Sequence, residues 1–217
     1  TAAQALRETV ALAQAADRLG YTRFWVAEHH GSGGLASAAP EILIGHIAAA
    51  TERIRVGSGG VMLSHYSSLK VAEQFRTLEA FHPGRIDLGV GRAPGGTQLA
   101  AAALAHGPGA LTLDQYPEQV QDLVLYLSDT LPEDHRFRGM QATPVVDGVP
   151  QVWCLGSSLD SAMIAAQVGL PFSFAQFINP EAGPRAVRLY RERFRPSAWC
   201  PEPRVSVGIS AIAAPTE

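Results

Sequence analysis

Helical and strand patterns alternate regularly along this chain of 217 residues, and this alternation is the strongest constraint on its fold. Helices are predicted where apolar residues recur every three or four positions, and strands where short runs are apolar on both faces. The predicted helices lie at 4–19, 40–50, 68–81, 114–127, 160–168 and 181–194, and the predicted strands at 24–28, 54–63, 85–90, 151–155, 172–177 and 204–213. Strict alternation predicts an α/β fold in which helices connect parallel strands.

Two α/β architectures fit this alternation. An open doubly wound sheet of six strands fits the length, whereas a TIM (β/α)8 barrel needs eight strands and typically ~250 residues. The chain begins on a predicted helix and ends on a predicted strand, which favours a fragment of a larger repeat. The first strand is not followed by a GxGxxG sequence, which weakens a dinucleotide-binding sheet. No change of composition divides the chain, so we expect a single domain over 1–217.

Composition narrows the class of partner and the compartment. The formal net charge is −3 and no Lys/Arg cluster is present, so neither nucleic acid nor a membrane surface is an expected partner. The two cysteines, Cys154 and Cys200, form no disulfide framework, and no apolar run approaches the ~18 residues of a membrane span. We therefore expect a cytoplasmic protein. No metal-ligand spacing occurs, so no metal site is expected.

The tripeptide Glu28-His29-His30 follows the first predicted strand. Catalytic groups of barrels lie where strands end and loops begin. Adjacent residues of a strand point to opposite faces, so only one of the two histidines is expected to face a pocket. Either His29 is an acid/base group or hydrogen-bond donor, with Glu28 orienting it or the ligand, or it is a core histidine satisfied by a carbonyl group.

Three polar residues at later strand ends suit a phosphate. Ser158 and Ser161 begin a predicted helix directly after a strand, where free N–H groups attract an anion. Ordinary helix capping by such serines is the commoner use. Arg92, in a Gly/Pro loop, either pairs with the phosphate or makes a surface contact. The sequence does not establish that these three residues meet.

Gly59 and Gly60 interrupt the second predicted strand. Glycine weakens a strand interior, so a pair of glycines there indicates a bulge, tight packing, or a close approach of the backbone to a bulky group.

Five segments resemble the luciferase-like flavin-dependent monooxygenases. They are FWVAEHH at 24–30, RIRVGSGGVML at 53–63, KVAEQFRTL at 70–78, GRIDLGVGRAPG at 84–95 and VWCLGSS at 152–158. They occur in the family's order with plausible spacing and cover nearly all of the chain. The resemblance implies a TIM barrel that binds FMN, usually in the reduced form that a separate flavin reductase supplies. Some relatives use the deazaflavin F420 instead.

The resemblance also implies roles for individual residues. His29, with Glu28, matches the catalytic position in the flavin and substrate pocket. Gly59-Gly60 matches the place of a non-proline cis peptide behind the flavin ring, and three residues match positions that hold the flavin phosphate: Arg92, Ser158 and Ser161. The expected activity is oxygenation of a small organic substrate by reduced FMN and O2, in a homodimer. The alternatives are F420-dependent hydride transfer and flavin binding without catalysis.

The sequence departs from the family pattern in two ways. Bacterial luciferase has a reactive cysteine where this chain has Gly91, so light emission is not implied. The family has a strand before the first helix and a helix-strand-helix portion after the last strand found here. We therefore expect an incomplete barrel.

Overall fold

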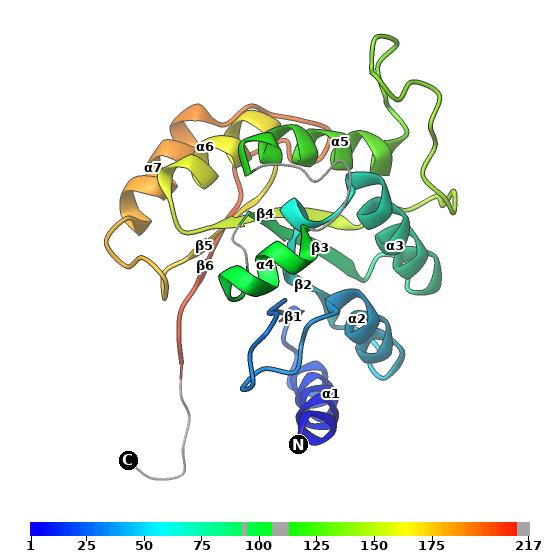
Figure 1. The fold of residues 1–217 in the computed structure, drawn as a ribbon, viewed down its shortest axis with the longest axis vertical. Helices are drawn as coiled ribbons and strands as arrows, with labels where there is room; N and C mark the ends of the chain where they lie inside the picture. Colours follow the sequence, from blue (N-terminus) through cyan, green and yellow to red (C-terminus); the bar gives the residue numbers. More distant parts are fainter. Residues whose placement is uncertain (93–94, 106–112, 212–217) are drawn as a thin grey trace. The chain divides into compact units, whose positions relative to one another are not determined.

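The structure is a computed structural model that describes residues 1–92, 95–105 and 113–211 (Figure 1). The chain divides into two compact units, Thr1–Val152 and Trp153–Glu217. Each unit is an α/β arrangement with parallel strands, and each is taken by itself below. The expectation of a single domain stays a prediction.

The first unit contains three parallel strands that follow one another in the chain. Strand β1 pairs with β2 and β2 pairs with β3, both in parallel. The elements are α1 (Ala2–Arg18), β1 (Arg23–Val26), α2 (Pro40–Ala49), β2 (Arg55–Met62), the 3-10 turn η1 (Leu63–His65), α3 (Ser68–Phe81), β3 (Ile86–Gly91), α4 (Gln98–Leu104), the 3-10 turn η2 (Leu113–Gln115) and α5 (Tyr116–Ser128). The register shifts between Gly59 and Val61, so the expected irregularity of β2 is confirmed.

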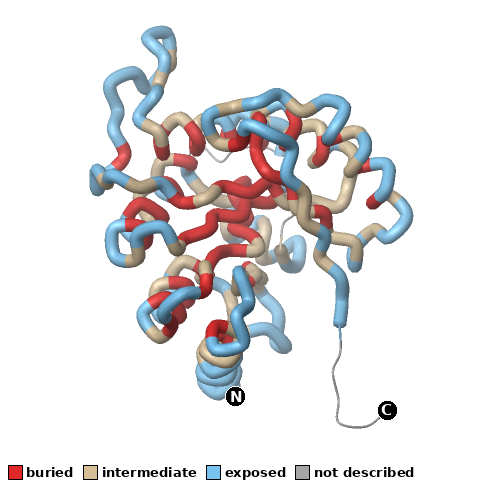
Figure 2. Tube along the Cα trace, turned by 180° about the vertical axis from the view of Figure 1, so that it is seen from behind, coloured by how far each residue is buried: buried red, intermediate tan, exposed pale blue. Residues whose placement is uncertain are grey.

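Helix packing explains which faces of the first unit are buried. Helix α2 packs on β2, and α3 contacts β3, α2 and α5. Strand β3 is buried along its whole length. Figure 2 shows these strands as buried, while the N-terminal helix α1 is largely exposed. No helix in the described part of the chain is long and apolar enough to cross a membrane.

The second unit repeats the same arrangement. Strand β4 (Gln151–Gly156) starts at the end of the first unit and pairs in parallel with β5 (Phe172–Ala175), which pairs in parallel with β6 (Val205–Gly208). Helices α6 (Leu159–Val168) and α7 (Gly183–Arg193) pack on each other and on β5. The predicted parallel α/β fold is therefore confirmed within each unit, whereas closure into a barrel stays a prediction.

Two predicted segments differ in the structure. No helix was predicted between the strand at 85–90 and the helix at 114–127, yet 98–104 form α4, where the Thr97 side chain accepts a hydrogen bond from the backbone N–H of Ala100 and caps the helix. The last predicted strand, 204–213, contains only the four residues of β6, because only those pair with β5. Its last two positions, like 93–94 and 106–112, lie outside the described residues.

The Asp17 carboxylate connects the end of α1 to the turn before β2. It accepts hydrogen bonds from the backbone N–H groups of Glu52 at 2.7 Å, Ile54 at 2.9 Å and Arg53 at 3.3 Å. The Glu52 N–H contributes most to holding the pKa of Asp17 below its usual 3.8, against the opposing effect of burial. A lowered folded-state pKa stabilises the protein above the unfolded-state pKa, and this stabilisation disappears as the pH falls through the folded-state pKa.

We therefore expect Asp17→Asn to lower the melting temperature at pH 7. The difference from the parent chain should shrink once the pH falls below about 3.8, because Asp17 is then protonated in the unfolded parent chain and the stabilisation from its folded-state charge declines. Thermal unfolding followed by circular dichroism between pH 7 and pH 2.5 measures this. Asp134→Asn, at an exposed loop position, is the control and should leave the melting temperature unchanged. A constant difference for Asp17→Asn at every pH would contradict the assignment.

Candidate active site at the ends of the first three strands

The carboxyl ends of β1, β2 and β3 lie side by side because these strands are parallel and paired. Val26 pairs with Ser58, Gly59 with Gly89, and Met62 with Gly91. Five of the seven sequence-predicted site residues lie in or next to these ends: Glu28, His29, Gly59, Gly60 and Arg92. The other two, Ser158 and Ser161, belong to the second unit.

The Glu28 side chain is a buried carboxylate at the centre of a hydrogen-bonded group. It is 1% exposed. Its Oε2 accepts the backbone N–H of Met62 at 2.9 Å. Its Oε1 accepts the Tyr66 hydroxyl at 2.6 Å and lies 2.7 Å from Nε2 of His30. Three partners thus compensate the removal of this charge from water.

The structure corrects one expected contact. Glu28 was expected to orient His29 or the ligand. Its carboxylate is paired with His30 and not with His29, whereas a role in orienting the ligand stays a prediction. The strand ends at Val26, so the simple alternation of faces does not continue through the tripeptide. The backbone N–H of His29 donates to Ser37 O at 2.9 Å, and its half-buried ring hydrogen-bonds to no residue that the structure describes. The imidazole of His29 is therefore available to a ligand on both nitrogens, within the described part of the chain.

The Gly59–Gly60 peptide is cis, which is the geometry that the family resemblance implied. A Cβ at Gly60 would lie 2.7 Å from the carbonyl oxygen of Gly89, and one at Gly59 would lie 3.1 Å from Cβ of Trp25. The backbone of β2 therefore approaches its neighbours too closely for a side chain at Gly60. Because Gly59 pairs with Gly89, the strand pair carries no side chains at that level.

A charged cluster supports Trp25 next to these glycines. The Trp25 indole N–H donates to Asp87 Oδ2 at 2.9 Å, and Asp87 is fully buried. Arg23 and Arg55 form ion pairs with the same carboxylate at 2.9 Å and 2.7 Å. Two guanidinium groups thus compensate the Asp87 charge, and the carboxylate fixes the position of the indole.

The predicted phosphate ligands have different surroundings in the structure. Arg92 is exposed, and its carbonyl oxygen accepts the Ser64 hydroxyl at 3.1 Å. Ser158 and Ser161 form a capping box at the start of α6: each side chain bonds the backbone N–H of the other at 3.2 Å. The capping interpretation of these serines is therefore confirmed.

Sequence reasoning missed Tyr66 and Gln119. Tyr66 follows η1 and donates to Glu28. Gln119, on α5, is 3% exposed, and its amide donates to Leu63 O at 3.1 Å and to Tyr66 O at 3.0 Å. No local pattern links positions this far apart in the sequence. A tyrosine just beyond a strand end was the one available indication.

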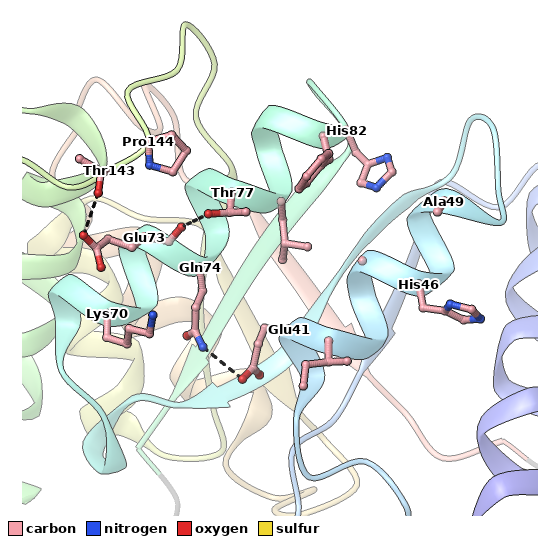
Figure 3. Close-up of a pocket in the computed structure, with 14 residues that line it drawn as sticks. Glu41, His46, Ala49, Lys70, Glu73, Gln74, Thr77, His82, Thr143 and Pro144 are labelled. Atoms are coloured by element: carbon pink, nitrogen blue, oxygen red, sulfur yellow. Dashed lines mark hydrogen bonds between the residues drawn. The ribbon is translucent and has the colours of Figure 1, made fainter.

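A separate hollow of about 1010 Å³ lies between α2 and α3 (Figure 3). Its lining includes Glu41 and Gln74, whose side chains are hydrogen-bonded at 3.2 Å, and Glu73, which accepts the Thr143 hydroxyl at 3.1 Å. It contains none of the predicted site residues. This hollow lies along the helices, whereas the candidate site lies at the strand ends.

The first unit thus has the arrangement of a parallel α/β enzyme, with polar side chains collected at the carboxyl ends of its strands. The family model of the luciferase-like monooxygenases matches residues 1–217. The chain belongs to this family, and the resemblance seen in the sequence is confirmed.

Individual relatives agree with this assignment. The chain is 55% identical to the uncharacterized protein YwcH of Bacillus subtilis (strain 168) over 98% of this chain and 64% of the relative. It is 51% identical to the N-acetyl-S-alkylcysteine monooxygenase of the same organism over 83% of this chain and 54% of that protein. The crystal structure of apo-MsnO8 superposes with a TM-score of 0.86 at 45% identity, over 95% of this chain and 60% of that one. The chain thus spans less than two thirds of the length of these relatives.

More distant structures share the fold alone. The oxygenating constituent of the 3,6-diketocamphane monooxygenase of Pseudomonas putida, in complex with FMN, has a TM-score of 0.70 at 19% identity, covering 89% of this chain and 58% of its own. An F420-dependent secondary alcohol dehydrogenase, in complex with an F420-acetone adduct, has a TM-score of 0.68 at 16% identity, covering 88% and 63%. These two proteins of the same fold thus differ in cofactor, FMN in the first and F420 in the second.

Proposed function

We propose that this chain is part of a flavin-dependent monooxygenase that uses reduced FMN and O2 to oxygenate a small organic substrate. Membership of the luciferase-like monooxygenase family supports the reaction class. The relative at 51% identity is named an N-acetyl-S-alkylcysteine monooxygenase, which supports an organic substrate. Reduced FMN, when bound, supplies the electrons that activate O2.

The observation that carries this proposal is a stretch of backbone without side chains beside Trp25. The paired glycines Gly59 and Gly89 leave one level of the strand pair without side chains, and Gly59 is only partly buried. A flat, aromatic ring system fits against such backbone, because no Cβ keeps it away. The same strand ends carry His29 with a ring not committed to described neighbours. These residues support the proposed binding of an isoalloxazine ring.

The chain's own side chains are assigned as follows. His29 binds the substrate or moves a proton to or from it, since its ring is free to do so among the described residues. Glu28 holds the geometry of the strand ends and is too buried to meet a ligand directly. Arg92 in the first unit, and the N-terminus of α6 with Ser158 and Ser161 in the second, remain proposed phosphate ligands. The capping hydrogen bonds hold both serines at the N-terminus of α6, where the proposed phosphate would bind.

Two partners are proposed on the family resemblance. A separate flavin reductase is the proposed source of reduced FMN. A second copy of the chain is proposed to complete a homodimer.

Anaerobic titration of the 217-residue chain with reduced FMN tests the proposed cofactor, with reduced F420 titrated in parallel. Saturable binding of FMN alone is the expected result. Binding of F420 alone would replace the proposal by hydride transfer without oxygen. Binding of FMN without turnover when O2 and candidate thioether substrates are added would favour a flavin-binding protein that does not catalyse.

A Trp25→Phe variant sharpens this titration. It keeps an aromatic ring beside Gly59 but removes the indole N–H that donates to Asp87. We expect FMN binding to weaken in this variant, while Trp199→Phe in the second unit serves as the matched control.

A further inference from the structure

The Glu28 carboxylate contacts Nε2, one of the two ring nitrogens of His30. Oxygen Oε1 of a carboxylate can only accept, and Nε2 of His30 lies 2.7 Å from it. With an ionised Glu28, Nε2–H of His30 is the donor in this pair. Because Nε2 is committed to Glu28, only Nδ1 of the His30 ring can interact with anything else, and no described residue hydrogen-bonds to Nδ1. The side chain of His30 is 14% exposed, so solvent still reaches part of the ring.

Tyr66 is a second fixed donor to the same oxygen. Its hydroxyl lies 2.6 Å from Glu28 Oε1 and 3.4 Å from Nε2 of His30. Burial, followed by the hydrogen bond to Glu28, raises the pKa of Tyr66 well above its usual value, so the hydroxyl stays protonated and keeps donating.

The backbone around Tyr66 is held from a different helix. Gln119 on α5 donates to the carbonyl groups of Leu63 and Tyr66, at the two ends of η1. The Ser68 hydroxyl in turn donates to Gln119 O at 2.9 Å. Tyr66 therefore reaches Glu28 from a segment that α5 fixes in place.

The titratable groups around His30 come from several elements. Glu28 lies beyond β1 and Tyr66 beyond η1. The ring of His65 is edge-on to that of His30, with centroids 6.3 Å apart. Glu41 on α2 acts on the Tyr66 hydroxyl through its charge. Glu28 and Tyr66 are the groups whose side chains lie within hydrogen-bonding distance of Nε2 of His30.

We propose that His30 is a second ligand-contacting histidine of this site, a neutral imidazole held by Glu28 and Tyr66 so that its Nδ1 accepts a hydrogen bond from an N–H or O–H group of the bound ligand. Glu28 and Tyr66 are then positioning residues that act through His30. This assignment deepens the proposed function and rests on it only for the identity of the ligand. The hydrogen-bonded geometry itself involves no flavin.

Nuclear magnetic resonance of the 15N-labelled chain tests this assignment, because it observes the Nε2 proton directly. In the parent chain we expect a far-downfield Nε2 proton signal that is protected from exchange, assigned by its loss in His30→Gln. In Tyr66→Phe this signal should move further downfield, since His30 becomes the only donor to Oε1. In Glu28→Gln it should move upfield or vanish, because a neutral amide oxygen is a weaker acceptor.

Opposite shifts in the two variants separate positioning from a general loss of structure. Tyr190→Phe is the matched control, because it removes another buried tyrosine hydroxyl, which donates to Leu170 O in the second unit. It should leave the His30 signal unchanged. Shifts in the same direction for Tyr66→Phe and Glu28→Gln, or no Nε2 proton signal in the parent chain, would overturn the proposal.

Addition of reduced FMN under anaerobic conditions tests the contact with the ligand. We expect the Nδ1 resonance of His30 to shift saturably as FMN, or the organic substrate added after it, binds. Saturable binding of both with no change at Nδ1 would also overturn the proposal. If neither flavin binds while the variants give opposite proton shifts, the proposed cofactor fails and the positioning of His30 is supported, so the two failures are distinguishable.

Discussion

Arg76→Ala is expected to lower the free energy of unfolding by about 3 kcal/mol or more. The Arg76 side chain lies on α3 and is 2% exposed. Its guanidinium group donates to the carbonyl groups of Ala142 at 2.7 Å, Tyr126 at 2.9 Å and Leu127 at 3.0 Å. It also pairs with Asp129 at 2.7 Å. Truncation would leave three buried acceptors without a partner and a void in the core.

The size of this effect matters because a domain of this kind is stable by only about 5–15 kcal/mol. Urea unfolding followed by circular dichroism measures the loss. Arg138→Ala is the matched control: Arg138 pairs with Glu133, but the two side chains are 65% and 84% exposed, so the loss there should be below about 0.5 kcal/mol. Equal losses for the two variants would show that the buried carbonyl contacts of Arg76 do not stabilise the fold.

The same guanidinium group shows why part of the fold was predictable and part was not. Helix α3 was predicted over 68–81 from apolar residues at helical spacing, and the structure has it there. Arg76 is a charged residue in the interior of that helix sequence. Nothing in its local sequence indicates that the end of α5 and the segment near Ala142 fold over it and bury it. The spacing of apolar residues predicts the helix, whereas contacts between distant parts of the sequence decide which polar residues are buried.

The candidate site, too, was predictable from the sequence only in part. Its location at strand ends was predictable, since parallel strands bring their carboxyl ends together. The pairing of Glu28 with His30 was not, because β1 ends at Val26 and the chain then follows other contacts, with the His30 N–H donating to Gly95 O at 2.8 Å. The role of Tyr66 depends on a hydroxyl that is 38 residues from Glu28 in the sequence. A short sequence motif contains no information on such a partner.

The serines of α6 show that one sequence motif can fit two different roles. Ser158 and Ser161 suit both a phosphate and a helix cap, and the cap is the commoner use of such serines. In the structure each hydroxyl is bonded to the backbone N–H of the other residue. The capping box accounts for both serines without a ligand. Their proposed contact with a phosphate therefore needs its own test, independent of the helix that they cap.

His29→Ala is expected to lower coupled turnover by about 10²–10⁴-fold, the usual contribution of a positioned acid/base group. Binding of reduced FMN should change little, because the bare backbone at Gly59 and Gly89, not the imidazole, is the proposed contact for the ring. The fold should also be retained, since the His29 ring hydrogen-bonds to none of the described residues. The turnover rate is measured by stopped flow in air, and the affinity for reduced FMN is measured by the anaerobic titration.

The control for His29→Ala is His46→Ala, which removes an imidazole from the hollow between α2 and α3, away from the strand ends. Turnover of that variant should equal that of the parent chain. Equal turnover of His29→Ala and the parent would remove His29 from the chemistry and leave His30 as the histidine that meets the ligand. A loss of FMN binding that matches the loss of turnover would instead show that His29 holds the cofactor, because a residue that acts only on the substrate leaves cofactor affinity unchanged.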